Sequence, residues 1–220
     1  MGELSMKLYG ALLSPFVRKV AVIATEKGIS WDLARGGPGS TDPEFLAASP
    51  LGKIPAIDDD GFTLADSTAI AFYLDAQYPA PRLIPDDAKQ RAKAVFWDEF
   101  ADTVLGASGL KILFNRLVGP KLLKVGGDEA VALQGEAELP RWVDWFESEV
   151  PEDGWLLGDA FSLADIAVAS TFRTLAYVGH GVDAAVRPRT AAWFARVAQR
   201  PAWASVAERE EVVAKRIMAL

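Results

Sequence analysis

Three short segments carry residues that could take part in chemistry, and each lies at the start of a predicted element. Ser14 precedes Pro15 and an amphipathic run that ends at Gly28, which predicts a helix with Ser14 at its N-terminus. Backbone N–H groups and the helix dipole favour an anion at such a position. Ser14 is therefore either a plain helix cap or a hydroxyl that stabilises an anion.

The second segment places Ile54 and Pro55 at the entry of a predicted strand. A proline suits the first residue of a strand because it cannot donate to the ladder, and an X-Pro bond in a tight turn can be cis. Such a turn leaves the N–H and C=O of Ile54 free to pair with an extended peptide. An ordinary tight turn is the alternative interpretation.

The third segment, Asp66 and Ser67, opens a predicted helix whose apolar residues fall on one face. A serine hydroxyl at a helix N-terminus binds a carboxylate, and a neighbouring aspartate binds an ammonium. Either residue could instead cap the helix. The three segments together provide an amino-acid clamp, a peptide clamp and an anion-stabilising hydroxyl, a combination that suits a small peptide carrying a thiol.

Composition excludes several other functions. The net charge of −7 argues against a nucleic-acid partner, which needs a basic face. The chain has no cysteine, so disulfides and thiolate metal sites are excluded, and its single histidine, His180, is predicted to lie in a loop. We expect no metal. No run approaches the roughly 18 apolar residues of a membrane span, and the expected location is the cytoplasm.

The order of the predicted elements divides the 220 residues into two parts. Strands at 7–10, 31–34, 56–58 and 62–64 alternate with helices in the order βαβ, helix, ββ, helix. After a proline-rich segment only helices are predicted, at 86–117, 128–150, 162–178, 187–199 and 201–219. The predicted fold is α/β followed by an all-α bundle, with domains at 1–79 and 86–220 and a linker at 80–85.

Two further segments of the helical part have their own interpretations. Ser162 and Asp165 resemble a capping box, which nucleates a buried helix and performs no chemistry. The helix that starts near Asp86 carries an apolar cluster of Val95, Phe96, Trp97 and Phe100. This cluster predicts contact with a two-fold-related partner, together with the helix at 67–78; the alternative is that it serves the monomer's own core.

In order and spacing, residues 14–20, 51–55, 66–70 and 162–165 resemble the cytosolic-type glutathione S-transferases, and the resemblance covers essentially the whole chain. The start of the chain is most similar to the serine-type enzymes, such as the plant tau and phi classes and their bacterial relatives. The resemblance implies a thioredoxin-like N-terminal domain that binds glutathione, a helical C-terminal domain and a homodimer. It also implies transfer of glutathione to a small hydrophobic electrophile, as in detoxification.

The resemblance also implies a role for individual residues. Ser14 falls at the catalytic serine, Ile54 at the residue whose backbone pairs with the cysteinyl unit, and Pro55 at the cis-proline. Asp66 and Ser67 fall at the γ-glutamyl clamp, and Lys53 is the candidate for the glycyl carboxylate. The expected contributors to the co-substrate wall are Leu13, Ser108, Ile112 and Phe114.

The chain departs from the family pattern at two points. Asp66 is shorter than the Glu or Gln that often precedes the clamp serine, and no basic residue lies between Gly36 and Gly52, so Arg35 and Lys53 are the nearby substitutes. Two other functions are compatible with the same fold. One is a glutathione-dependent isomerase or dehalogenase, and the other is a non-catalytic carrier of hydrophobic ligands.

Overall fold

The computed structural model describes residues 5–218 of the chain, and its strands form one sheet within the first 65 residues. The strands are β1 (Met6–Tyr9), β2 (Trp31–Ala34), β3 (Ala56–Asp59) and β4 (Phe62–Ala65). Their order across the sheet is β2-β1-β3-β4. β1 is parallel to β2, whereas the β1–β3 and β3–β4 pairs are antiparallel. A helix joins the parallel pair, as a crossover between parallel strands requires.

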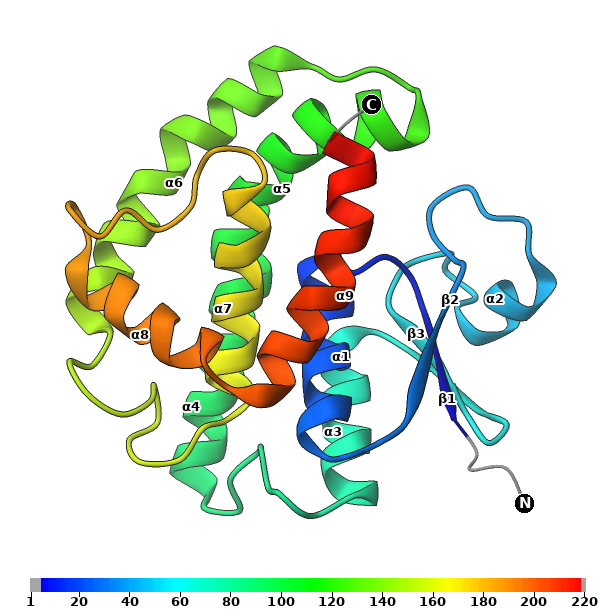
Figure 1. Ribbon diagram of the computed structural model, residues 1–220, viewed down its shortest axis with the longest axis horizontal. Helices are drawn as coiled ribbons and strands as arrows, with labels where there is room; N and C mark the ends of the chain where they lie inside the picture. The colour runs from blue at the N-terminus through cyan, green and yellow to red at the C-terminus, as the bar shows by residue number, and fades with distance from the viewer. Residues whose placement is uncertain (1–4, 219–220) are drawn as a thin grey trace.

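Helices cover both faces of the sheet (Figure 1). They are α1 (Pro15–Glu26), α2 (Pro43–Ala48) and α3 (Ser67–Gln77). Leu8 and Ile57 are buried in the main core with residues of α1 and α3. Tyr9 packs on the opposite face against Phe45 of α2. Successive residues of a strand point to opposite faces, so Leu8 and Tyr9 belong to different hydrophobic clusters.

The rest of the described chain is helical. Its elements are α4 (Ala88–Glu99), η1 (Phe100–Leu105), α5 (Gly106–Leu113), η2 (Phe114–Leu123), α6 (Glu129–Glu149), α7 (Leu163–Ala176), α8 (Pro188–Ala198) and α9 (Pro201–Met218). α7 is buried along most of its length and lies in the middle of this part, next to α1 (Figure 1). The predicted order of elements and the predicted fold class are confirmed.

The helix predicted to end at Leu117 is longer than expected. It runs without a break from α4 through the π-helical segments η1 and η2 to Leu123, and it ends where Lys124 adopts a left-handed conformation with φ 57°. Pro120 lies inside η2. A proline has no N–H to donate, so the turn that holds Pro120 lacks one backbone hydrogen bond. The helix nevertheless continues past Pro120 to Leu123. The predicted end of the last helix, Ala219, lies outside the described residues.

Ser162 and Asp165 have the structural role that the sequence predicts. The backbone N–H of Ser162 donates to Asp165 Oδ2 over 3.2 Å at the start of α7. Asp165 Oδ1 also accepts from the Leu156 N–H and from Trp193 Nε1, each at 2.9 Å. Burial raises the pKa of the Asp165 carboxyl. This carboxyl therefore joins a loop, α7 and α8 at one buried point.

Candidate active site

Ser14 stands immediately before α1, and its hydroxyl makes no helix-capping hydrogen bond. The residue lines a large cavity, and its backbone N–H closes a turn by donating to Ala11 O over 2.9 Å. Within the described residues, the Phe16 and Val17 N–H groups at the start of α1 have no backbone partner. The serine hydroxyl and the positive end of the helix are both available to an anion.

The turn before β3 presents the backbone of Ile54 to the same cavity. The bond between Ile54 and Pro55 is cis. No hydrogen bond joins the Ile54 N–H or C=O to any other residue of the described chain. Ser49 is fully buried and holds the turn from behind: its Oγ donates to Lys53 O over 2.6 Å and accepts from the Lys53 N–H over 3.0 Å. The Ile54 backbone can therefore pair with an extended peptide.

Asp66 and Ser67 follow this turn at the start of α3 and are not among the residues that line the cavity. The Asp66 N–H donates to Pro55 O over 3.3 Å, which ties the start of α3 to the turn. Asp66 Oδ1 caps α3 by accepting from Thr68 N and Ala69 N, each at 3.0 Å. Its φ of 84° is unusual for a non-glycine residue, and such strain occurs mainly at functional sites. The Ser67 side chain is only 4% exposed, and its hydroxyl bonds to no other described residue.

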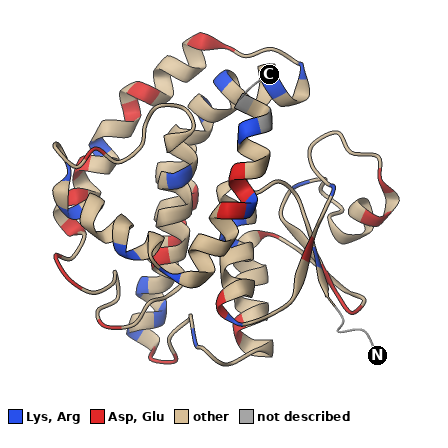
Figure 2. Cartoon of the chain, in the orientation of Figure 1, with Lys and Arg blue, Asp and Glu red and all other residues tan. Residues whose placement is uncertain are grey.

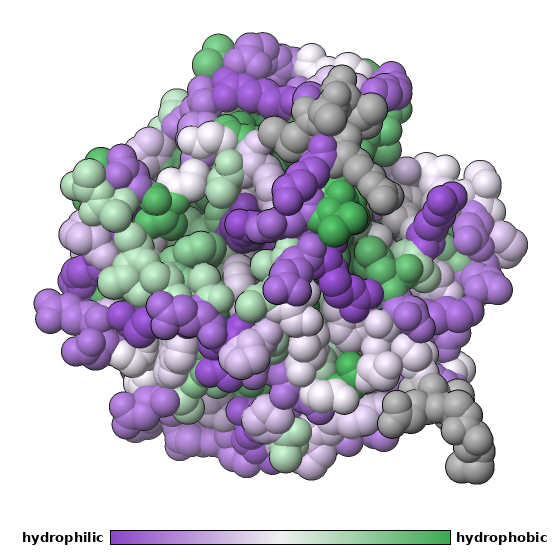
Figure 3. Space-filling view, in the orientation of Figure 1, coloured by the Kyte–Doolittle hydropathy of each residue, from purple (hydrophilic) through white to green (hydrophobic). Residues whose placement is uncertain are grey.

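The cavity has a volume of about 800 Å³ and lies between the strand-containing part and the helical part. Such a volume is typical of a small-molecule site. It brings together Leu13, Ser14, Lys53, Ile54 and Phe114 of the predicted residues. Hydrophobic surface lies between the two parts of the molecule on the face seen in Figure 3.

Ser108 and Ile112 are not brought to this cavity, which corrects the expectation for the co-substrate wall. Both lie on the face of α5 that packs against α6, with 2% and 0% exposure. Ser108 Oγ bonds to Glu138 of α6 over 3.3 Å. Tyr9 also lies away from the cavity, because its ring packs against Phe45 on the other face of the sheet. Burial raises the pKa of the Tyr9 hydroxyl.

Several residues of the cavity were missed by the sequence reasoning. The glycine-rich loop after β2 lines one side, and apolar residues of η2 line the opposite side. The lining residues that were not predicted as site residues are Ala11, Pro15, Phe16, Gly36, Gly37, Pro38, Gly39, Ser40, Leu110, Leu113, Val118, Leu122 and Leu123. The apolar spacing between Leu110 and Leu123 was a usable signal, but the sequence does not show which face of the helix meets the serine. No feature of the sequence marks Ser49 as the residue that holds the turn before β3.

A buried polar network connects α1, α3 and α4 near the clamp residues. Lys19 Nζ donates to Asp98 Oδ1 over 2.6 Å and to Asp102 Oδ2 over 2.8 Å. Thr68, the residue after Ser67, donates its hydroxyl to Asp98 Oδ2 over 2.6 Å. Burial raises the pKa of Asp102 to about 6. The network holds the start of α3 against the helical part.

Charges of both signs are interspersed along the helices of the described chain, as Figure 2 shows. Lys53 is the cation that lines the cavity, and no ion pair joins it to another residue in 5–218. That part of the chain holds no group of three His, Cys, Asp or Glu side chains suited to a metal ion. Its helices also lack the combination of length and apolar character that crossing a membrane requires.

Comparisons with known proteins agree with this arrangement. The glutathione S-transferase N-terminal domain model matches residues 8–82, and the C-terminal domain model matches residues 107–201. A glutathione S-transferase from Hyoscyamus muticus is 31% identical over 213 residues, covering 93% of this chain and 99% of the relative. Glutathione S-transferase 3 from Zea mays is 34% identical over 207 residues, covering 90% of this chain and 91% of the relative.

Solved structures give the same result. The structure of glutathione S-transferase-I bound with the ligand lactoylglutathione has a TM-score of 0.80 and 26% sequence identity. The match covers 93% of this chain and 99% of that chain.

Proposed function

Because the chain belongs to the glutathione S-transferase family and acts as a glutathione transferase, we propose that Ser14 stabilises the glutathione thiolate. The observation that supports this role is a serine hydroxyl that lines the cavity and makes no capping bond. A free thiol has a pKa near about 8.5. Lowering it by about two units requires about 2.7 kcal/mol, within reach of a charge-assisted hydrogen bond and a helix dipole.

The other site residues bind the rest of the glutathione molecule in this proposal. The Ile54 backbone pairs with the cysteinyl unit beside Pro55, and Asp66 and Ser67 hold the ammonium and carboxylate of the γ-glutamyl end. Lys53 binds the glycyl carboxylate. Three features support these assignments: the unbonded Ile54 backbone, the unbonded Ser67 hydroxyl and the Lys53 side chain, which forms no ion pair with another described residue.

The second substrate is proposed to be an uncharged apolar electrophile. Leu13 and Phe114 face the cavity together with further leucines and valines of the helical part. The thiol proton passes to solvent, and the thiolate donates an electron pair to form a carbon–sulfur bond. A leaving group departs with its bonding pair, or an activated alkene takes up a proton after addition. Ser14 keeps its own proton and donates a hydrogen bond to the sulfur.

Replacing Ser14 with alanine tests the catalytic role. The bound thiol's pKa should rise, and turnover should fall by roughly 10- to 150-fold, as expected for one charge-assisted hydrogen bond of about 1.5–3 kcal/mol. Glutathione affinity should change much less, because the clamps lie elsewhere. Thiolate absorbance against pH and steady-state rates measure both quantities. Full turnover with an unshifted titration would refute the proposal.

Replacing Ser67 with alanine tests the binding role. The dissociation constant for glutathione, measured by calorimetry, should rise by about tenfold or more, since a hydrogen bond to a charged group is lost. Ser148→Ala is the matched control, because Ser148 is an exposed serine that bonds to Trp145 O on α6. Equal affinity for both variants, or no binding at millimolar glutathione, would contradict the assignment.

We also propose that the protein is a homodimer. Trp97 and Phe100 of the predicted cluster belong to the monomer's core, whereas Phe96 on α4 is 52% exposed and Phe72 on α3 is 37% exposed. These exposed rings lie on the two helices predicted to meet a partner. Light scattering at micromolar concentration should give twice the monomer mass, and Phe96→Glu should shift it toward the monomer. A monomeric wild type would refute the dimer.

The domain limits and the cellular location are further proposals. We assign residues 1–79 to the glutathione-binding domain, 80–85 to the linker and 86–220 to the helical domain. We place the protein in the cytoplasm, where the glutathione system keeps thiols reduced. Cell fractionation tests the location.

A further inference from the structure

The peptide unit between Leu13 and Ser14 is held from both sides. The N–H of Ser14 donates to Ala11 O over 2.9 Å, within its own turn. The carbonyl oxygen of Leu13 accepts from the hydroxyl of Thr174 on α7 over 3.0 Å, across the junction between the two parts of the molecule. A peptide unit is planar, and the Cα atom of Ser14 lies in this plane. The two hydrogen bonds therefore fix the Cα atom of Ser14, to which the side chain is attached.

Arg18 determines the direction in which the Thr174 hydroxyl donates its hydrogen bond. Arg18 Nη1 donates to Thr174 Oγ1 over 2.8 Å and to Ser170 O over 2.7 Å. A threonine hydroxyl has one hydrogen to donate, and the arginine nitrogen is itself a donor. The Thr174 hydrogen must therefore point at the Leu13 carbonyl. Thr174 is 3% exposed and Arg18 is 1% exposed, so water does not compete for these groups.

The charged groups around Thr174 come from three helices. Arg18 on α1 forms an ion pair through Nε with Glu210 on α9, and Glu210 is fully buried. Glu210 also accepts from Arg173 Nε over 3.0 Å and from the Tyr177 hydroxyl, which follows α7. Burial raises the pKa of Tyr177 to about 12. The network thus connects the last helix to the turn that carries Ser14.

We propose that Thr174 is a positioning residue for the transferase reaction, which sets the Ser14 hydroxyl against the glutathione sulfur by holding the Leu13 carbonyl. The proposal rests on the role proposed above for Ser14. Thr174 lies in the helical part and does not line the cavity. Its effect passes through the backbone, and misplacing a reacting group by about 1 Å can cost about 100-fold in rate.

Thr171 offers a matched control on the same helix. It is also 3% exposed, and its hydroxyl lies 3.4 Å from Ala101 O and from Ala167 O, which are helical carbonyls away from the serine turn. Replacing either threonine with valine removes one buried hydroxyl and keeps the shape of the side chain. The loss of a buried threonine hydroxyl is thus common to the two variants, whereas the loss of the hydrogen bonds to Leu13 O and Arg18 Nη1 belongs to Thr174→Val alone.

The experiment compares Thr174→Val, Thr174→Ser and Thr171→Val with the wild type. For Thr174→Val we expect a raised pKa of the enzyme-bound glutathione thiol and a kcat at least about tenfold lower. Its glutathione dissociation constant should change by less than about threefold, because the clamps are untouched. Thr174→Ser should restore both values, and Thr171→Val should match the wild type. If Thr174→Val does not fold, Thr174→Ala takes its place.

A comparison with Ser14→Ala separates the two proposals. If Ser14→Ala shifts the thiol pKa and Thr174→Val does not, Thr174 is only structural and this inference is overturned. If Ser14→Ala leaves the thiol pKa unchanged, the role of Ser14 fails, and the positioning role fails with it. In the double variant, Thr174→Val should add no further shift to that of Ser14→Ala. An additive shift would show that Thr174 acts by another route and would also overturn the inference.

Discussion

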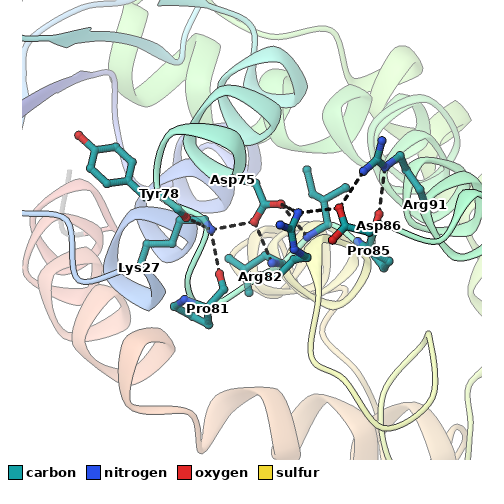
Figure 4. A network of polar contacts seen from close by, with 10 residues as sticks. Lys27, Asp75, Tyr78, Pro81, Arg82, Pro85, Asp86 and Arg91 are labelled. Carbon is teal, nitrogen blue, oxygen red and sulfur yellow. Dashed lines mark hydrogen bonds and ion pairs between the residues drawn. The ribbon is translucent and has the colours of Figure 1, made fainter.

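Lys27 and Asp75 form a buried ion pair at the junction of the two parts of the molecule, with 2.7 Å between Lys27 Nζ and Asp75 Oδ1 (Figure 4). The same ammonium donates to Tyr78 O over 2.7 Å and to Pro81 O over 2.8 Å. Asp75 Oδ1 also accepts from the Leu83 N–H over 2.8 Å. One lysine at the end of α1 therefore holds both the end of α3 and the segment that leads to the helical part.

Replacing Lys27 with methionine should be strongly destabilising. The change removes the close cation of a buried carboxylate, which within the described chain keeps only Arg82 Nη1 at 3.9 Å from its Oδ2. It also leaves the Tyr78 and Pro81 carbonyl groups without this donor, and breaking a buried pair costs about 3–5 kcal/mol. Chemical denaturation measures the loss. Lys7→Met is the control, because Lys7 pairs with Glu44 over 3.0 Å while both side chains are exposed, and such pairs contribute at most about 1 kcal/mol. Equal losses would contradict the prediction.

The raised pKa of the Asp102 carboxyl predicts that the stability of the protein depends on pH. Burial raises its pKa from the ordinary value of 3.8 to about 6. Below about pH 4 the folded and unfolded states both hold the proton, whereas between the two pKa values only the folded state keeps it. Unfolding then releases a proton. The contribution of the Asp102 carboxyl to the free energy of unfolding is therefore lost as the pH rises from about 4 through 6. The full loss is up to about 3 kcal/mol, from a shift of about two units.

The variant Asp102→Asn tests this dependence. Its unfolding free energy relative to the wild type should increase between pH 4 and pH 7, because the asparagine does not ionise. Ser148→Ala, at an exposed position of α6 that carries no ionisable side chain, is the control and should show no such trend. A difference between Asp102→Asn and the wild type that stays constant over this range would show that the carboxyl titrates normally.

The sequence predicts local features well because they depend on neighbouring residues. Ser14, Pro15 and Gly28 bracket α1, and the turn at Ile54 and Pro55 was identified from one proline at a strand entry. Each of these predictions uses a preference that acts within a few residues. The elements and the segments that line the site follow from such preferences.

The direction of a helical side chain depends on distant residues, and the sequence predicts it poorly. Ile112 and Phe114 are two residues apart, so their side chains point about 200° apart around the helix axis. Either could face the serine until α6 packs against α5 and buries Ile112 completely. The partners of Leu13, on α7 and α9, are likewise more than 150 residues away in the chain.

Phe114 and Ile112 should therefore respond differently to replacement by alanine. Phe114 lines the cavity and is 44% exposed, so Phe114→Ala should raise the KM for an apolar electrophile with little loss of stability. Ile112→Ala creates a cavity in the core and should cost about 2–5 kcal/mol. Thermal unfolding and co-substrate kinetics on both variants measure the contrast. A large change in KM for Ile112→Ala without loss of stability would reverse the assignment.

Asp66 combines a capping role with a charge, and replacement by asparagine separates the two. The amide oxygen of the introduced asparagine can accept from Thr68 N and Ala69 N as the carboxylate does, and asparagine tolerates the positive φ of 84°. Asp66→Asn should therefore keep the stability of α3 within about 0.5 kcal/mol. It removes the negative charge proposed to meet the glutathione ammonium, so the dissociation constant for glutathione should rise by about tenfold or more.

Asp66→Ala completes the test, because alanine lacks both the cap and the tolerance of positive φ. This variant should lose about 1–3 kcal/mol of stability in addition to the affinity, from the missing cap and the backbone strain. Calorimetric binding and chemical denaturation on both variants give the two quantities separately. If Asp66→Asn binds glutathione as tightly as the wild type while Asp66→Ala is destabilised, the carboxylate serves only as a helix cap, and the ammonium must be bound by another group.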